Sequence, residues 1–125
     1  MTKRAPLILV LDDDPNILEP TADLLRQHGF EVVTAADGSE GLELVFQRLP
    51  DLMLVDLAMP GIDGLEFARR VGRMAATSKI PVVAYTAHAF GSSSDDARAA
   101  GFDAVISKPT RADQLVRVVQ KCLAL

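Results

Sequence analysis

The sequence is poor in the residues that mark secreted or membrane-spanning proteins. Its 125 residues include a single cysteine, Cys122, so no disulfide can form within the chain, which fits a reducing compartment. There is no tryptophan, and aromatic residues make up only 5% of the chain, so a core must come mainly from aliphatic side chains. No apolar stretch is long enough to span a bilayer. We therefore expect a cytoplasmic protein without membrane insertion.

Positive charge is also scarce. Lysine and arginine together number 13 against 17 aspartates and glutamates, which gives a net charge of −4, and no basic cluster is present. Binding to a phosphate backbone depends on clustered basic side chains, so we expect no direct contact with nucleic acid. The length suits one domain with one core. We predict that residues 1–125 form a single domain and that no output domain is present.

Short apolar runs recur along the chain and predict five strands. Runs of this length and continuity are typical of parallel strands that are covered on both faces. The runs are Leu7–Leu11, Phe30–Ala35, Leu52–Asp56, Ile80–Thr86 and Ala104–Ser107. Helical patterns separate them, and this alternation predicts an α/β fold with a parallel sheet and helices on both sides.

Five helices are predicted between and after these strands. They cover residues 15–27, 38–49, 64–74 and 95–100, with a last helix that starts near Thr110. Asp14, Asp37 and Asp63 each stand where an N-cap is expected, and the last two are followed three residues later by a glutamate, as in a capping box. Pro20 lies inside the first helix and predicts a kink or a late start there.

Chemically active side chains follow four of the predicted strands. Asp12 and Asp13 come after the first strand and Asp56 ends the third, while Thr86 ends the fourth and Lys108 follows the fifth. The carboxyl ends of parallel strands meet at one edge of the sheet, so these side chains should converge. Three carboxylates at close range repel one another unless a cation holds them, and a few carboxylates plus waters suit Mg²⁺.

Such a set of groups is equipped for phosphoryl transfer. A carboxylate can accept the phosphoryl group as an acyl phosphate while a metal ion and a lysine neutralise its oxygens. The sequence offers no obvious general base at this edge, which favours a group receiver over a fast hydrolase. Each residue alone has an ordinary explanation, since Asp56 could merely start a turn and Lys108 could be a solvated turn residue. The combination is what favours a function.

Four stretches of the sequence resemble the receiver domain of bacterial two-component response regulators. They are LVLDDDP at residues 9–15, LVDLAMPGIDG at 54–64, AYTAH at 84–88 and ISKP at 106–109. They follow one another in the order and at the spacing of that family and cover essentially the whole chain. The resemblance implies a single-domain, flavodoxin-like, doubly wound fold with five helices and strand order 2-1-3-4-5.

The resemblance also implies a function and a set of site residues. Asp56 would accept a phosphoryl group from a sensor histidine kinase or a histidine phosphotransfer protein, and the domain would then switch its interaction with a downstream protein target. Thr86 would donate its hydroxyl to one phosphoryl oxygen and Lys108 would pair with another. The implied magnesium ligands are Asp13, Asp56 and the backbone carbonyl of Ala58, with Asp12 acting through water. Such a domain is not an enzyme in the usual sense, because it catalyses only its own phosphorylation and dephosphorylation.

One position departs from the family pattern. Val105 stands where family members usually carry a tyrosine or phenylalanine that takes part in switching. We therefore expect signalling through order in the segment Ala87–Asp96.

Three alternative functions compete with the receiver. A pseudo-receiver that only docks partners would not need the acidic residues. An aspartyl-phosphate phosphatase needs a second acid two residues after the nucleophile, where Ala58 stands. A flavin-binding flavodoxin needs a phosphate-binding loop after the first strand, where three aspartates would repel phosphate.

Overall fold

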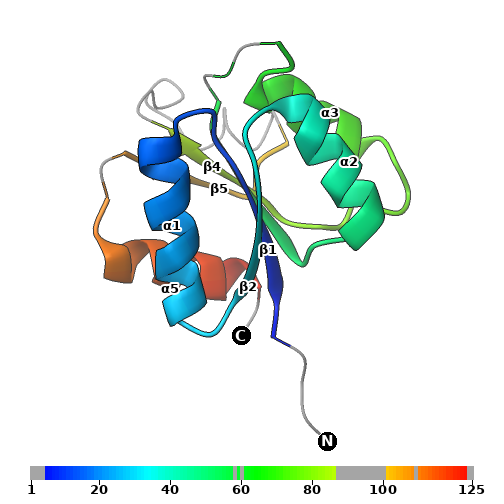
Figure 1. Cartoon of the computed structure of the whole chain (residues 1–125). Coiled ribbons are helices and arrows are strands. Elements are labelled where there is room, and N and C mark those ends of the chain that lie inside the picture. Colours follow the sequence, from blue (N-terminus) through cyan, green and yellow to red (C-terminus); the bar gives the residue numbers. More distant parts are fainter. Residues whose placement is uncertain (1–4, 58, 60, 87–100, 109, 124–125) are drawn as a thin grey trace, which may run out of the picture.

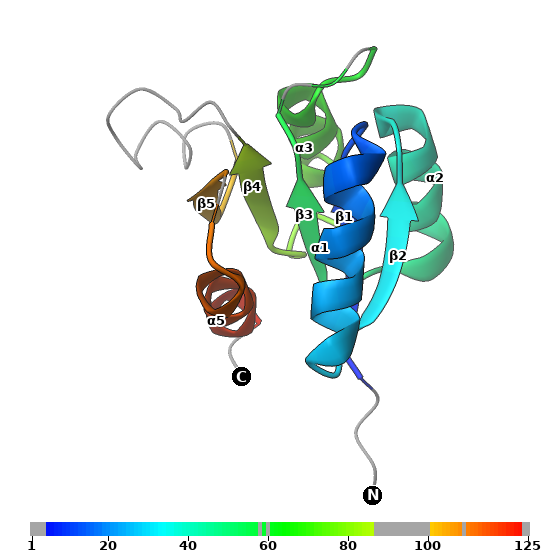
Figure 2. The same cartoon turned by 60° about the vertical axis from the view of Figure 1, so that its left-hand side comes forward.

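A five-stranded parallel sheet forms the centre of the molecule (Figure 1). The computed structural model describes residues 5–57, 59, 61–86, 101–108 and 110–123. The strands are β1 (Leu7–Leu11), β2 (Glu31–Ala35), β3 (Leu52–Val55), β4 (Val82–Thr86) and β5 (Ala104–Ser107). Their order across the sheet is β2-β1-β3-β4-β5, and every neighbouring pair is parallel. In Figure 2 the arrows of β2, β3 and β4 point the same way. The predicted sheet and its strand order are confirmed.

Helices cover both faces of this sheet. The four helices among the described residues are α1 (Pro15–Gln27), α2 (Gly38–Arg48), α3 (Gly64–Gly72) and α5 (Ala112–Cys122). In Figure 1, α1 and α5 lie on one side of the sheet and α2 and α3 on the other. The helix predicted at residues 95–100 and the segment 87–96 expected to switch lie outside the described residues.

The predicted N-caps of the first three helices are present. The carboxylates of Asp14, Asp37 and Asp63 accept hydrogen bonds from backbone N–H groups two or three residues later, at 2.8–2.9 Å. Each bond satisfies one of the N–H groups that a helix leaves unpaired at its start. Helix α1 begins at Pro15 and continues through Pro20, so the alternative of a late start was wrong.

The start of α5 differs from its prediction. Its N-cap residue is Arg111 rather than Thr110, and no side-chain hydrogen bond caps this helix. Asp113 lies in the first turn of α5, where its carboxylate pairs with the Arg111 guanidinium at 3.2 Å. This ion pair is exposed to solvent.

The core consists of two layers of mainly aliphatic side chains, one on each face of the sheet. Alternate strand residues point to opposite faces, so Ile8 packs on the α1 and α5 side whereas Leu9 packs on the α2 and α3 side. All five residues of β1 and all four of β3 are buried, as expected for central parallel strands. Phe102 belongs to the second layer, with 2% of its surface exposed.

Candidate functional site

The acidic residues lie where β1 and β3 end. The backbone N–H of Asp12 donates to the carbonyl of Ala35, and the N–H of Asp56 donates to the carbonyl of Leu11, at 3.1 and 2.9 Å. These bonds continue the sheet by one residue beyond each strand. The backbone that carries the two carboxylates is therefore held as firmly as the strands themselves.

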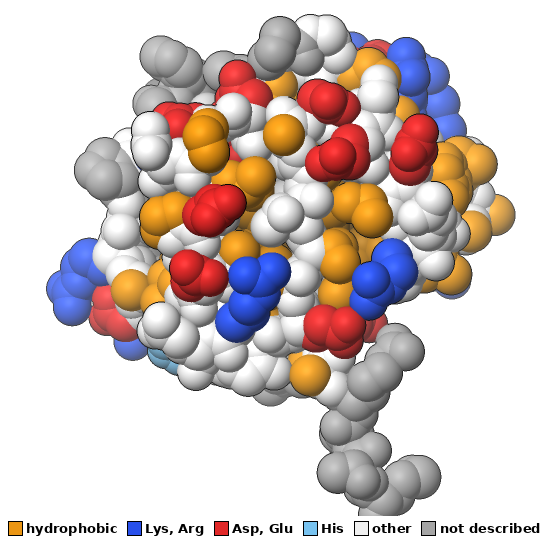
Figure 3. Space-filling view, viewed as in Figure 1, with side chains coloured by type: hydrophobic (Ala, Val, Ile, Leu, Met, Phe, Trp, Pro, Cys, Tyr) orange, Lys and Arg blue, Asp and Glu red, His pale blue; other side chains and the backbone are white. Residues whose placement is uncertain are grey.

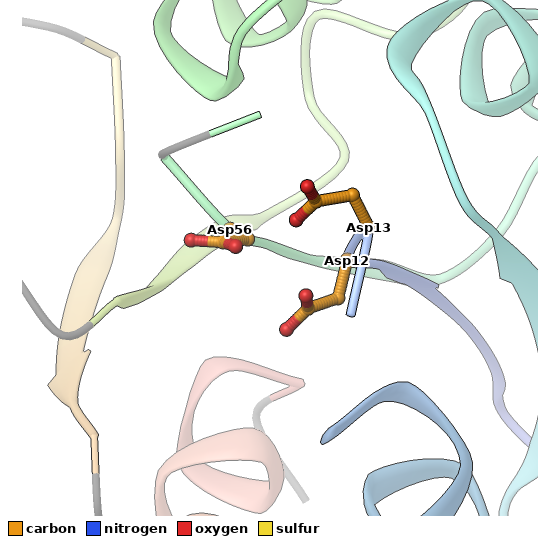
Figure 4. A group of neighbouring side chains, drawn as sticks. All are labelled: Asp12, Asp13 and Asp56. Atoms are coloured by element: carbon orange, nitrogen blue, oxygen red, sulfur yellow. The ribbon is translucent and has the colours of Figure 1, made fainter. Parts of the chain in front are cut away.

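Three carboxylates converge at this edge, as Figure 4 shows. Asp12, Asp13 and Asp56 each offer one carboxylate oxygen, and these oxygens lie within 4.8 Å of one another. Asp12 and Asp56 are buried, with 2% and 8% of their surface exposed, whereas Asp13 is exposed. Ionised carboxylates this close repel one another strongly when partly shielded from water. Hard oxygen ligands open to solvent on one side match the preference of Mg²⁺, which retains several of its waters.

Lys108 brings a positive charge into the same cluster. Its Nζ lies 2.6 Å from Oδ2 of Asp12 and 3.6 Å from Oδ2 of Asp56, and its side chain is 11% exposed. The backbone N–H of Lys108 donates to the carbonyl of Thr86 at 2.8 Å, which ties the residue to the end of β4. Among the described side chains, one ammonium group faces three carboxylates, and this arrangement favours a divalent cation.

Four of the residues predicted for the site come together in the structure. Asp12, Asp13, Asp56 and Lys108 meet as expected from the ends of three different strands. Thr86 is the last residue of β4, between β3 and β5, and is completely buried. The carbonyl of Ala58 lies outside the described residues.

Two glycines and one tyrosine near the site were not recognised from the sequence. A Cβ on Gly64 would overlap the backbone carbonyl oxygen of Asp56, and a Cβ on Gly38 would lie 2.6 Å from the carbonyl oxygen of Ile62. Both glycines thus allow the chain around the loop after β3 to pack against the starts of α2 and α3. The ring centroid of Tyr85 lies 5.0 Å from Nζ of Lys108. The glycine spacing could have suggested the close approach, whereas the ring contact depends on side-chain packing.

Acidic side chains also dominate the surface around this edge. Figure 3 shows them gathered on the upper half of the face, where α1 and α2 begin in Figure 1, with basic side chains mostly lower or at the margins. Each of α1, α2 and α3 also has an aspartate as its N-cap residue, and these helices start at the carboxyl ends of the strands.

The sequence matches the model of the response regulator receiver domain family over residues 8–120. The chain belongs to this family. Receiver domains are signalling modules of two-component and phosphorelay systems rather than classical enzymes, and the acidic cluster described above fits the magnesium site of the family.

Individual relatives agree with this assignment. Protein PilH of Pseudomonas aeruginosa is 31% identical over 94% of this chain and 97% of its own length. A putative response regulator from Chloroflexus aurantiacus is 33% identical, with a TM-score of 0.90 over 97% of this chain and 99% of that one. Other relatives are much longer: the chain spans 14% of the sensor protein GacS of Pseudomonas syringae, to which it is 35% identical. The same domain therefore occurs both in short proteins and as part of long ones.

One structural neighbour contains a metal ion. The receiver domain of the sensor histidine kinase PA1611 from Pseudomonas aeruginosa has magnesium coordinated in its active-site cleft. It is 25% identical to this chain, with a TM-score of 0.87 over 97% of this chain and 99% of that one. Among the residues that the structure describes, no helix has the length and apolar character needed to cross a membrane.

Proposed function

We propose that this receiver domain accepts a phosphoryl group on Asp56 in a magnesium-dependent reaction. The convergence of three carboxylates with the ammonium group of Lys108 at the carboxyl ends of the strands carries this proposal. Asp56 is the best candidate for the nucleophile because it directly follows the central strand β3 and its buried carboxylate lies close to both the other acids and the lysine.

The donor set fits magnesium, and the resemblance to receiver domains suggests the role of each ligand. Asp13 and Asp56 would bind the ion directly, Asp12 would act through water, and the carbonyl of Ala58 would complete the protein ligands. Asp12 is a poor direct ligand because its Oδ2 already accepts from Lys108 at 2.6 Å and its Oδ1 accepts from the N–H of Asp14 at 2.9 Å. When bound, the ion neutralises charge on the phosphoryl oxygens.

The chain's own groups account for the transfer step. A carboxylate oxygen of Asp56 attacks phosphorus, the bond from phosphorus to the histidine nitrogen of the donor breaks, and the imidazole leaves with the electron pair of that bond. Lys108 pairs with one oxygen of the transferred group, and the hydroxyl of Thr86 donates to another. The product is an acyl phosphate on Asp56, and no proton has to be removed from the nucleophile.

The donor would be the phosphohistidine of a sensor kinase or of a phosphotransfer protein. The phosphorylated domain would then change its affinity for a downstream protein target, in the cytoplasm and without contacting nucleic acid itself. A docking-only pseudo-receiver gains nothing from clustering three carboxylates, which costs electrostatic repulsion. No described feature favours that alternative.

Intact-mass measurement tests the proposal. Incubation with a small acyl phosphate and Mg²⁺ should add one phosphoryl group that survives acid and is lost in base, and a chelator should prevent the addition. Asp56→Asn should remain unmodified. Asp51→Asn is the matched control, because Asp51 precedes the same strand at its opposite end and the amide can keep its hydrogen bond to Leu7. A phosphoryl adduct that persists in Asp56→Asn would refute the assignment.

A further inference from the structure

Tyr85 is the only tyrosine of a chain that has no tryptophan. It lies on β4 directly before Thr86, is half-buried, and packs against the core layer on the α1 and α5 side of the sheet. Its ring centroid is 5.0 Å from Nζ of Lys108, within the range in which an aromatic face attracts an ammonium group.

The path of the Lys108 side chain explains why a ring at this place matters. Lys108 follows β5, whereas the carboxylate that it contacts at 2.6 Å belongs to Asp12 at the end of β1. The strands β4 and β3 lie between them in the sheet. The side chain must therefore reach across the end of β4, the strand that carries Tyr85. A lysine has a long flexible stem, and its ammonium group is a point charge without directional preference, so its position depends on what surrounds it.

We propose that Tyr85 is a positioning residue for Lys108. The ring attracts the ammonium group at the end of β4 and so keeps it beside Asp56, where it can pair with an incoming phosphoryl oxygen. Asp12 attracts the same ammonium group from the far side, and the ring limits how far it is drawn away from Asp56. This role rests on the proposed phosphorylation of Asp56, although the contact itself does not.

An ordinary core tyrosine would behave differently under substitution. If Tyr85 only fills space, leucine should replace it about as well as phenylalanine, because both bury apolar surface. If the ring attracts Lys108, phenylalanine should retain the effect and leucine should lose it, since the aromatic face rather than the hydroxyl group makes the contact.

The contact can be measured without any phosphorylation. The sequence contains four lysines, so lysine labelled with ¹³C gives a simple NMR spectrum in which Lys108 is assigned from its loss in Lys108→Arg. The Cε protons of Lys108 should be shifted by the ring current of Tyr85. This shift should remain in Tyr85→Phe and vanish in Tyr85→Leu. A Lys108 signal with the same shift in wild type and Tyr85→Leu would overturn the proposal.

The positioning role is tested by kinetic coupling. With a small acyl phosphate and Mg²⁺, Tyr85→Leu should slow phosphorylation about 3- to 10-fold, whereas Tyr85→Phe should stay within about twofold of wild type. In a Lys108→Ala background, Tyr85→Leu should have no further effect, because the group that the ring positions is gone. An equal slowing by Tyr85→Leu in both backgrounds would show that the residue acts only through packing, and would overturn the proposal.

The two measurements separate failure of this inference from failure of the proposed function. A wild-type protein that gains no phosphoryl group contradicts the proposed function, and with it the positioning role, while the ring-current shift still decides whether the contact exists. A phosphorylated wild type without coupling between Tyr85 and Lys108 contradicts the positioning role alone.

Discussion

The two ends of the sheet both carry aspartates, but their partners differ. At the amino end, Asp51 precedes β3 and accepts the backbone N–H of Leu7, the first residue of β1, at 2.7 Å. In the same way, Asp103 precedes β5 and accepts the N–H of Val82, the first residue of β4, at 2.9 Å. At the carboxyl end, Asp12 and Asp56 face other carboxylates and one lysine instead.

This difference separates a structural acid from a functional one. A carboxylate that accepts a buried backbone N–H satisfies a group that would otherwise be unpaired, and it needs no cation. The carboxylates of the other end concentrate negative charge, and within the described part of the chain three of them face the ammonium group of Lys108. The amino end therefore contributes stability, and the carboxyl end carries the proposed site for a metal ion and a phosphoryl group.

The largest effect that sharpens this comparison is expected at Asp13. Replacing Asp13 by alanine removes the exposed carboxylate of the cluster and should lower the affinity for Mg²⁺ about tenfold or more, because a direct charged ligand is lost. Titration calorimetry with Mg²⁺ measures this change.

Lys108→Ala is the matched variant from the same cluster. It removes a cation that competes for the same carboxylates, so its affinity for Mg²⁺ should be unchanged or higher. An affinity for Mg²⁺ in Asp13→Ala equal to that of wild type would count decisively against the proposed metal site.

The next largest effect is expected at Gly38, the first residue of α2. A Cβ there would lie 2.6 Å from the backbone oxygen of Ile62 and 2.7 Å from its Cβ, so Gly38→Ala must push the loop after β3 away from α2. Overpacking of this kind costs about 1–3 kcal/mol, and displacement of the loop after β3 should also weaken Mg²⁺ binding at the proposed site. Urea denaturation and Mg²⁺ titration measure the two effects.

Gly72→Ala serves as the control for Gly38, because a Cβ on Gly72 meets no atom within 4 Å. It should leave Mg²⁺ affinity unchanged and alter stability little. Equal behaviour of the two alanine variants would show that the tight approach of Ile62 to α2 does not shape the site.

The amino end should respond in stability alone. Asp103→Ala leaves the N–H of buried Val82 without its carboxylate partner, which should lower the free energy of unfolding by about 1–2 kcal/mol. Asp103→Asn should lower it less, since the amide oxygen can still accept. Mg²⁺ affinity should not change in either variant. A loss of Mg²⁺ binding in Asp103→Ala, measured on folded protein, would remove the distinction between the two ends.

Much of this arrangement was predictable from the sequence, and the reason is geometrical. Continuous apolar runs such as Leu52–Val55 identify buried parallel strands, and parallel strands bring the residues after their ends together at one edge. The positions of Asp12, Asp56 and Lys108 at such ends therefore predicted their meeting. The aspartates at helix starts are equally local signals, because a cap and its helix are only residues apart.

The features that were missed or wrong depend on contacts between distant or competing groups. The sequence does not show that the ring of Tyr85 approaches Lys108, because that contact needs both side chains placed in three dimensions. At the start of α5, Thr110 was the better capping residue by type, but Asp113 pairs with Arg111 and the helix begins without a side-chain cap. Asp51 and Asp103 were not recognised because their partners lie on strands 44 and 21 residues away.

The smallest effect is expected for the pKa of the Cys122 thiol. Asp103, at the amino end of the sheet, acts on this thiol through its negative charge. Burial raises the pKa of the Cys122 thiol above its ordinary value, and the negative charge of Asp103 raises it further. The folded protein therefore holds the thiol proton to higher pH than the unfolded chain does. The resulting stabilisation is fully present below the pKa of the unfolded chain and is lost as pH rises through that of the folded protein.

Alkylation of Cys122 by iodoacetamide as a function of pH measures this shift, because the thiolate is the reacting form. The rate profile of the native protein should lie at higher pH than that of the denatured chain. Asp103→Asn keeps an oxygen that can accept the N–H of Val82, but it removes the negative charge. It should therefore move the rate profile to lower pH, part of the way toward that of the denatured chain. Asp113→Asn removes an acid from the opposite end of α5 and should leave the profile in place. If both variants behaved alike, the charge of Asp103 would have no specific effect on the thiol, and its role would reduce to the hydrogen bond alone.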